Sequence, residues 1–248
     1  MFGKKLVNGG SLKVQLLDCT SNPEKVIATA AKTCYSPGTT EHLWNTDGDF
    51  EQFIAKLRKM HHMSPFEHAS FVFGIDGVSR VLLAQLTRHR IASFSVQSQR
   101  YVKYDTENID YSELFEIPDG IMEGPEAAFD NYMDALEEIA ASYENLVAVL
   151  QENGLSKTEA AENARYILPG GMKTNLVMTM NARELMHFFE LRCCNRAQDE
   201  IRQLAWTMLY LLQERFPSIF ADCGPKCLTS KCGEGTMSCG KPYQKGLF

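Results

Sequence analysis

Short strand-like segments separated by longer helical ones set the strongest limit on the fold of this 248-residue chain. Residues 12–17, 70–75 and 174–180 have the apolar or alternating character of strands, and helical patterns fill most of the sequence between them. Strands that are few and interrupted by helices fit an α/β or an α+β fold, and the pattern alone leaves both open. A hydrophobic content of 44% is ordinary for a globular core, and we expect a single domain.

The helices are predicted from apolar residues that recur at helical spacing. A long helix is predicted over residues 129–150, and Ser156 with Glu159 forms a capping box that starts the next one. The other predicted helices cover residues 23–34, 50–60, 78–87, 182–194 and 197–216. Residues 101–122 look irregular, and we expect residues 88–100 to leave the preceding helix as a loop.

Residues 88–100, with the sequence RHRIASFSVQSQR, hold three arginines, one histidine and three serines in an acidic chain. A guanidinium group carries a fixed charge and a planar fork of donors that can bind two phosphate oxygens at once. Cations near a helix C-terminus also offset its macrodipole by about 0.3–1 kcal/mol, which explains Arg88 and Arg90 but not Arg100. We therefore favour a site for a phosphorylated ligand. Because the chain has neither a Gly-x-Gly-x-x-Gly motif after a strand nor a P-loop sequence, side chains must bind the phosphate.

The formal net charge of −6 argues against a general nucleic-acid binder or a protein of anionic membranes, since both need a broad basic surface. The first eight residues are followed by no apolar stretch long enough for a signal peptide or a membrane span, so we expect a cytoplasmic protein that does not bind membranes. The eight cysteines fit that compartment as free thiols or metal ligands, because cytosolic thiols stay reduced.

The arginine-rich run also resembles a family motif, in which Arg-His-Arg is followed by seven residues and then Ser-x-Arg. The matching positions are Arg88, His89, Arg90, Ser98 and Arg100. This is the motif of the flavin-dependent thymidylate synthases. The resemblance continues at residues 62–68 (HMSPFEH) and 181–192 (NARELMHFFELR), in the family's order and approximate spacing, and covers most of residues 12–220.

The resemblance implies an α+β fold in which a mixed, largely antiparallel sheet packs with helices. It implies a homotetramer whose active sites draw residues from more than one subunit. The implied reaction is the methylation of dUMP to dTMP, with FAD as cofactor, methylenetetrahydrofolate as carbon donor and NADPH as reductant. The family domain would cover residues 1–220, and we treat the Cys/Gly-rich tail, residues 221–248, as an appendage too poor in large apolar residues to build a core.

The resemblance assigns site residues by position. The implied flavin contacts are Ser64, Arg88, His89, Arg90, Asn181, Arg183 and His187. The implied dUMP contacts are Gln85, Arg88, Gln97, Ser98, Arg100 and Arg192. Arg192 is also the implied catalytic residue, because a guanidinium group beside the imide can stabilise negative charge that develops on the pyrimidine ring. The structural alternative is a salt bridge from Arg192 to Glu184 or Glu190.

The chain departs from the family pattern at three places. Ser95 and Val96 stand where many members have Asn-Glu. Asn175 stands where some members have an arginine that helps to hold the nucleotide, with Lys173 nearby as a candidate substitute. His187 is asparagine in other members. The contacts made at these positions must therefore differ from those in such members.

The cysteines suggest two further kinds of site. Cys193 and Cys194 follow an arginine, which can favour a thiolate nucleophile. We expect them instead to be small core residues, because the family uses flavin chemistry in place of a cysteine adduct. Four tail cysteines lie at positions 223, 227, 232 and 239. They could hold one zinc ion, but paired Cys-x-x-Cys hooks are missing, so we favour free thiols and no bound metal.

Two other functions fit parts of the sequence. A single-stranded nucleic-acid binder would use a basic surface with stacking aromatic rings. Its residues would be Arg88, Arg90, Arg100, Tyr101, Lys103 and Tyr104. The acidic net charge counts against this function. A histidine phosphatase would use His89 as its nucleophile, but such a pocket expects glycine after the histidine, and this chain has Arg90.

Overall fold

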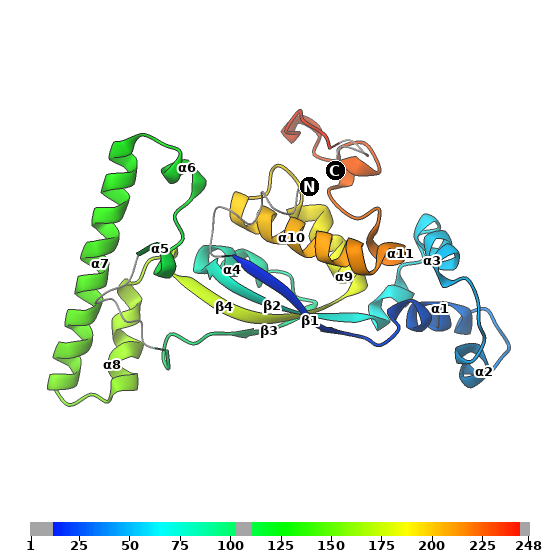
Figure 1. Ribbon diagram of the computed structural model, residues 1–248, viewed down its shortest axis with the longest axis horizontal. Helices are drawn as coiled ribbons and strands as arrows, with labels where there is room; N and C mark the ends of the chain where they lie inside the picture. Colours follow the sequence, from blue (N-terminus) through cyan, green and yellow to red (C-terminus); the bar gives the residue numbers. More distant parts are fainter. Residues whose placement is uncertain (1–11, 103–110, 244–248) are drawn as a thin grey trace.

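The computed structural model describes residues 12–102 and 111–243. Its sheet has four strands in the order β1-β2-β4-β3, and every pair of neighbours is antiparallel (Figure 1). The strands are β1 (Lys13–Cys19), β2 (Ser70–Ser79), β3 (Ala92–Val96) and β4 (Lys173–Asn181). The α+β class is therefore confirmed, and the sheet is antiparallel throughout the described residues rather than mixed.

Helices make up most of the remaining described chain. The α-helices are α1 (Pro23–Thr33), α2 (Thr40–Trp44), α3 (Phe50–Lys59), α4 (Arg80–Leu86), α5 (Tyr111–Leu114), α6 (Asp119–Met122), α7 (Glu126–Glu152), α8 (Lys157–Ala164), α9 (Ala182–Arg192), α10 (Asp199–Arg215) and α11 (Pro217–Phe220). The 3-10 helices are η1 (Ser64–His68), η2 (Arg165–Ile167), η3 (Lys226–Leu228) and η4 (Gly235–Met237). Helices α5 and α6, each of one turn, lie within the segment predicted to be irregular. No helix in the described ranges is both long enough and apolar enough to cross a bilayer.

The strand β3 lies inside residues 88–100, which the sequence predicts as a loop, and that prediction is wrong for this strand. Phe94 is half-buried between Ser93 and Ser95, which are both exposed, so the side chains alternate as a strand requires. Serine is common in turns, and the two serines therefore concealed this alternation in the sequence.

The strand β2 is longer than predicted, because it continues through a bulge to Ser79. Gly77 in this bulge has a φ of 73°, a left-handed conformation that glycine adopts without a steric cost. Helix α4 therefore begins at Arg80, and Ser79 is its N-cap, with Oγ accepting a hydrogen bond from the Leu82 N–H at 3.0 Å. This helix leads directly into the arginine-rich run.

The main core lies between the sheet and helices α9, α10 and α11, which Figure 1 shows on one side of the sheet. Phe71, Phe73 and Ile75 of β2 alternate into this core and are fully buried. The Phe71 ring packs edge-on against Phe216 and Phe220, with centroid distances of 5.3 Å to each. Such aromatic pairs add roughly 0.5–1.5 kcal/mol beyond the burial of area. The core thus fixes α9, which carries several predicted site residues, over the sheet.

Helices α7 and α8 form a hairpin at one end of the sheet (Figure 1). They have a small core of their own, with Tyr143 and Val147 from α7 and Ala160 and Ala164 from α8. The predicted capping box at the start of α8 is confirmed, because the side chain of each partner bonds the backbone of the other.

We expect Ser156→Ala to lower the free energy of unfolding by about 1 kcal/mol. Ser156 Oγ accepts a hydrogen bond from the Glu159 N–H at 3.3 Å, and Glu159 Oε2 accepts one from the Ser156 N–H at 2.9 Å. Chemical denaturation of both proteins measures the loss. The control is Ser142→Ala, at an exposed position inside α7, which should not destabilise the protein. Equal stability of Ser156→Ala and wild type would show that the box contributes nothing.

The described part of the tail packs on the helical layer. The Tyr243 ring lies 5.3 Å, centroid to centroid, from that of Trp206 in α10, and its hydroxyl donates to Asn195 Oδ1 at 2.6 Å. The described part of the tail therefore folds back on α10. The division of the chain at residue 220 stays a prediction.

Candidate active site

Glu184, His89 and Arg192 form a chain of hydrogen bonds inside the protein. His89 Nδ1 lies 3.2 Å from Glu184 Oε1, and the Nε–H of Arg192 donates to His89 Nε2 at 3.2 Å. His89 is only 6% exposed and Glu184 only 8%. The imidazole also packs edge-on against Phe188, with a centroid distance of 5.0 Å. A buried imidazole thus connects an acidic and a basic side chain of the same helix.

Helix α9 positions most of this cluster. Asn181 is its N-cap, and Asn181 Oδ1 accepts a hydrogen bond from the Glu184 N–H at 2.9 Å. Glu184, Phe188 and Arg192 follow at intervals of four residues, which places their side chains on one face of the helix. His89 meets this face from the segment that follows α4.

His89 is the neutral Nδ1–H tautomer in this arrangement, because the Glu184 carboxylate needs a donor and the Arg192 N–H needs an acceptor. Burial lowers the pKa of His89; the hydrogen bond to Glu184 opposes this effect, and the charge of Arg192 adds to it. Both ring nitrogens are engaged, so His89 has no free lone pair for attack on a phosphate. The arrangement therefore gives the phosphatase alternative no support, and a flavin contact at His89 would use its backbone or ring carbons rather than a ring nitrogen.

Three arginines lie next to His89: Arg192 through a hydrogen bond, and Arg88 and Arg90 as its neighbours in the chain. Arg88 and Arg90 flank it with exposed side chains. Burial lowers the pKa of Arg192, and the nearby charge of Arg88 lowers it further. Among the described residues, no carboxylate lies within 4 Å of these three groups. Like charges gathered without a counter-charge indicate an anionic ligand, and this set of donors fits a pyrophosphate such as that of FAD.

The other predicted flavin residues lie at the same end of the sheet. They are Ser64, Asn181, Arg183 and His187. Arg183 forms an ion pair with Glu67, which joins α9 to the 3-10 helix that begins at Ser64. His187 is exposed, and its ring centroid lies 6.3 Å from that of His89. The structure therefore brings the predicted flavin residues together around α9 and the end of α4.

The predicted dUMP residues do not gather at one place. Arg88 and Arg192 belong to the His89 cluster, and Gln85 lies on α4. The remaining residues, Gln97, Ser98 and Arg100, follow the far end of β3. Strand β3 has five residues, so at about 3.3 Å per residue it separates the two groups by roughly 15 Å. Arg100 there pairs with Glu162 of α8, at 3.0 Å between Nε and Oε2. One chain alone therefore does not bring the predicted dUMP residues into a single pocket.

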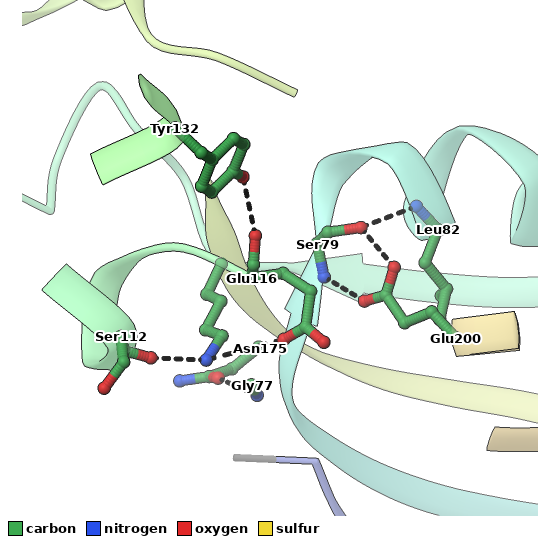
Figure 2. Close-up of polar contacts among 9 residues, drawn as sticks. Gly77, Ser79, Leu82, Ser112, Glu116, Tyr132, Asn175 and Glu200 are labelled. Atoms are coloured by element: carbon green, nitrogen blue, oxygen red, sulfur yellow. Dashed lines mark hydrogen bonds and ion pairs between the residues drawn. The ribbon is translucent and has the colours of Figure 1, made fainter. Parts of the chain in front are cut away.

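A different polar cluster fixes the far end of β2 (Figure 2). The N–H and Oγ–H of Ser79 donate to the two carboxylate oxygens of Glu200, at 2.6 and 2.5 Å. Burial raises the pKa of Glu200, and these hydrogen bonds to the ionised form oppose that effect. Because Ser79 caps α4 and Glu200 lies in the first turn of α10, the carboxylate joins the starts of two helices.

Asn175, which stands where some family members have a nucleotide-binding arginine, and its candidate substitute Lys173 both bond to other residues of this chain. Asn175 Oδ1 accepts a hydrogen bond from the Gly77 N–H at 3.0 Å, across the β2 bulge (Figure 2). Lys173 Nζ donates to the Ser112 carbonyl at 2.6 Å and lies 3.5 Å from Glu116 Oε2, with its side chain 10% exposed. Asn175 thus braces the bulge, and the Lys173 ammonium group is held inside the fold.

A cavity of about 190 Å³ lies beside this cluster. Its lining includes the carboxylates of Glu116, Asp119, Asp199 and Glu200. Such a lining repels phosphate, and none of the predicted site residues lines the cavity. Gln85 only touches its edge, through a hydrogen bond from Nε2 to Gln198 Oε1 at 3.4 Å. The His89 cluster, rather than this cavity, is therefore the candidate active site.

The cysteines take no part in this cluster. Cys193 is fully buried in the core, as expected, and burial raises its pKa well above the ordinary value. Burial also raises the pKa of Cys223 to about 12. All eight cysteines are free. Within residues 12–102 and 111–243, no three His, Cys, Asp or Glu side chains are grouped closely enough to hold a metal ion.

The nucleic-acid alternative gains no support from the arrangement of charges. Arg100 is paired with Glu162 and lies at the other end of β3 from Arg88 and Arg90, so these arginines do not form one basic surface. Of the three other residues of that surface, Tyr101 is exposed beside Arg100, and Lys103 and Tyr104 lie outside the described residues.

Glu184 is the member of the cluster that was not among the predicted site residues. The sequence offered it, or Glu190, as a direct ion-pair partner of Arg192. Instead Glu184 reaches Arg192 only through His89, and Glu190 lies 3.7 Å from Lys226 Nζ. The signal that could have identified it is the spacing of four residues to Phe188 and again to Arg192.

Comparison with known proteins identifies the family of this chain. Residues 15–218 match the family described as thymidylate synthase complementing protein. Proteins named flavin-dependent thymidylate synthase are similar over nearly their whole length. The protein from Clostridium tetani is 42% identical over 245 residues, which cover 93% of this chain and 94% of that protein. The proteins from Geobacter sulfurreducens (43% over 240 residues, 96% and 98%) and Pyrococcus furiosus (38% over 223 residues, 88% and 87%) are also similar. The chain therefore belongs to the thymidylate synthase complementing protein family, that of the flavin-dependent thymidylate synthases.

Proposed function

We propose that this protein, an FAD-dependent thymidylate synthase by family, methylates dUMP to dTMP with methylenetetrahydrofolate as carbon donor and NADPH as reductant. The supporting observation is the group of Arg88, Arg90 and Arg192 around buried His89, with no described carboxylate within 4 Å of the guanidinium groups. FAD carries a pyrophosphate and dUMP a phosphate, so a site for both needs several guanidinium groups.

Each residue of the site has its own role. Arg88 and Arg90 bind phosphate oxygens, and the other flavin contacts orient the cofactor. Bound FAD supplies the hydride transfer. The terminal nitrogens of Arg192 have no partner among the described residues, so they are available to donate to the imide of the pyrimidine. There they stabilise the negative charge that develops on the ring, which makes an enzyme nucleophile unnecessary. The inert, buried Cys193 agrees with such a mechanism.

We infer that the active enzyme is a homotetramer in which one subunit completes the site of another. The support is the distance of roughly 15 Å along β3 between Arg90 and the dUMP residues that follow the strand. The sheet face opposite α9 and α10 also exposes apolar side chains, with Leu17 49% and Val177 40% accessible. Such a surface is typical of a contact between subunits.

A cytoplasmic location is inferred from the cysteines. All eight are free, and three of them, Cys34, Cys232 and Cys239, are exposed. Exposed thiols persist in a reducing compartment, whereas secreted proteins tend to pair them.

The test is an assay on the purified protein. We expect it to turn yellow with FAD and to release tritium from dUMP labelled at the ring carbon that receives the methyl group. Release of labelled water together with dTMP formation should require both methylenetetrahydrofolate and NADPH, which are omitted in turn. Protein that stays colourless with FAD, and that gives no heat when titrated with dUMP, would falsify the proposal.

A further inference from the structure

We propose that Glu184 is a positioning residue: by accepting a hydrogen bond from Nδ1–H of His89, it presents Nε2 of that ring as an acceptor that aims Arg192 at the pyrimidine. This inference rests on the proposed function, in which Arg192 touches the substrate. It gives His89 a role as a link within the protein, in addition to the flavin contact that the family resemblance implies.

The first support is the burial of the Glu184 carboxylate. The side chain of Glu184 is 9% exposed and that of His89 5%. A buried carboxylate is costly unless it is paired, and among the described residues the only side chain bonded to this one is His89. The carboxylate does not cap α9, because Asn181 does so. Its contact with His89 therefore accounts for an acidic residue at this buried position.

The second support is the direction of the hydrogen bonds. Neutral imidazole has one donor nitrogen and one acceptor nitrogen. The carboxylate accepts from Nδ1, so Nε2 must accept, and the Nε–H of Arg192 donates to it at 3.2 Å. Without the carboxylate, the ring can hold its proton on Nε2, where it would point at the Arg192 N–H. The arginine would then lose the contact that fixes the plane of its guanidinium group.

The third support is that packing against Phe188 holds the imidazole in place. Phe188 packs edge-on against the imidazole at 5.0 Å, on the same helix face as Glu184 and Arg192. The other N–H groups of Arg192 have no partner among the described residues, so they are available to a ligand. Small changes in His89 are therefore transmitted to the guanidinium group.

The arrangement also makes the site sensitive to pH. The charged or titratable groups that face His89 are Glu184, His187 and Arg192 on α9, with Arg88 and Arg90 beside it in its own segment. Protonation of His89 places an N–H on Nε2 against the Arg192 N–H, so activity is lost on the acidic side. Glu184 raises the pKa of His89, and its removal must lower that pKa. The acidic limb of the rate profile should then move to lower pH.

The experiment uses two variants of the full-length protein loaded with FAD. Glu184→Gln keeps an acceptor for Nδ1–H but removes the charge, whereas Glu184→Leu removes both. Nitrogen-15 NMR of histidine-labelled protein should show His89 as the Nδ1–H tautomer in wild type and Glu184→Gln, and as the Nε2–H tautomer in Glu184→Leu. We expect kcat for tritium release to fall by about 10²-fold in Glu184→Leu, the size typical of a misplaced group, and by only a few-fold in Glu184→Gln.

The pH profile of Glu184→Gln supplies the readout that a purely structural role would not change, because its acidic limb should lie at lower pH than that of wild type. Glu190→Gln, on the same helix but at the surface, is the matched control and should behave as wild type. The proposal is overturned if Glu184→Leu keeps the Nδ1–H tautomer, or if the limb of Glu184→Gln does not move. If wild type itself turns over no dUMP, the proposed function fails, and with it the role of Glu184 in that function. The NMR result still decides whether Glu184 sets the tautomer of His89.

Discussion

Arg192→Ala is expected to lower the rate of dTMP formation by about 10²–10³-fold, the range found when one preorganised donor to a developing charge is removed. The reason is local. Arg192 donates to the buried His89 and lies near the exposed Arg88, and its terminal nitrogens have no partner among the described residues. Tritium release from labelled dUMP measures the loss, and the flavin absorbance of the purified variant measures retained FAD.

Two variants separate charge from geometry in this prediction. Arg192→Lys keeps a cation but lacks the planar fork that reaches His89 and the substrate together, so we expect it to recover only part of the rate. Arg215→Ala removes an exposed arginine at the end of α10 and should leave the rate unchanged. Arg192→Ala protein that binds FAD and keeps most of its turnover would show that the uracil ring is activated elsewhere.

Much of the fold follows from local patterns in the sequence. The apolar face of α7 and the Ser156–Glu159 capping box define their helices without any knowledge of the rest of the chain. Strand β3 does not follow in this way, because Ser93 and Ser95 resemble turn residues until β4 supplies the partner strand. An edge strand of five residues has few apolar positions, so its identity depends on long-range pairing.

The candidate site shows the same division between local and long-range information. The cationic character of the run around His89 is visible in the sequence, and it predicts an anionic ligand. The contact between His89 and Glu184 joins residues 95 positions apart, so no local pattern reports it. The separation of Arg100 from Arg90 depends on β3, the strand that the sequence did not predict. The local sequence therefore predicts the charge of the site, whereas the spatial arrangement of its residues depends on long-range contacts.

Glu200→Ala is expected to lower the free energy of unfolding by about 2–4 kcal/mol, because it removes two hydrogen bonds to a charged group and leaves the buried Ser79 N–H without its acceptor. The carboxylate joins the start of α10 to the start of α4, as Figure 2 shows. Its neighbour Asp199 provides the control: it is an exposed carboxylate in an i,i+3 pair with Arg202, so Asp199→Ala should cost less than about 1 kcal/mol. Urea denaturation of the three proteins measures the difference. Equal losses for the two alanine variants would mean that the Ser79–Glu200 contact adds no more stability than a surface ion pair, and that α4 holds the arginine-rich segment in place without it.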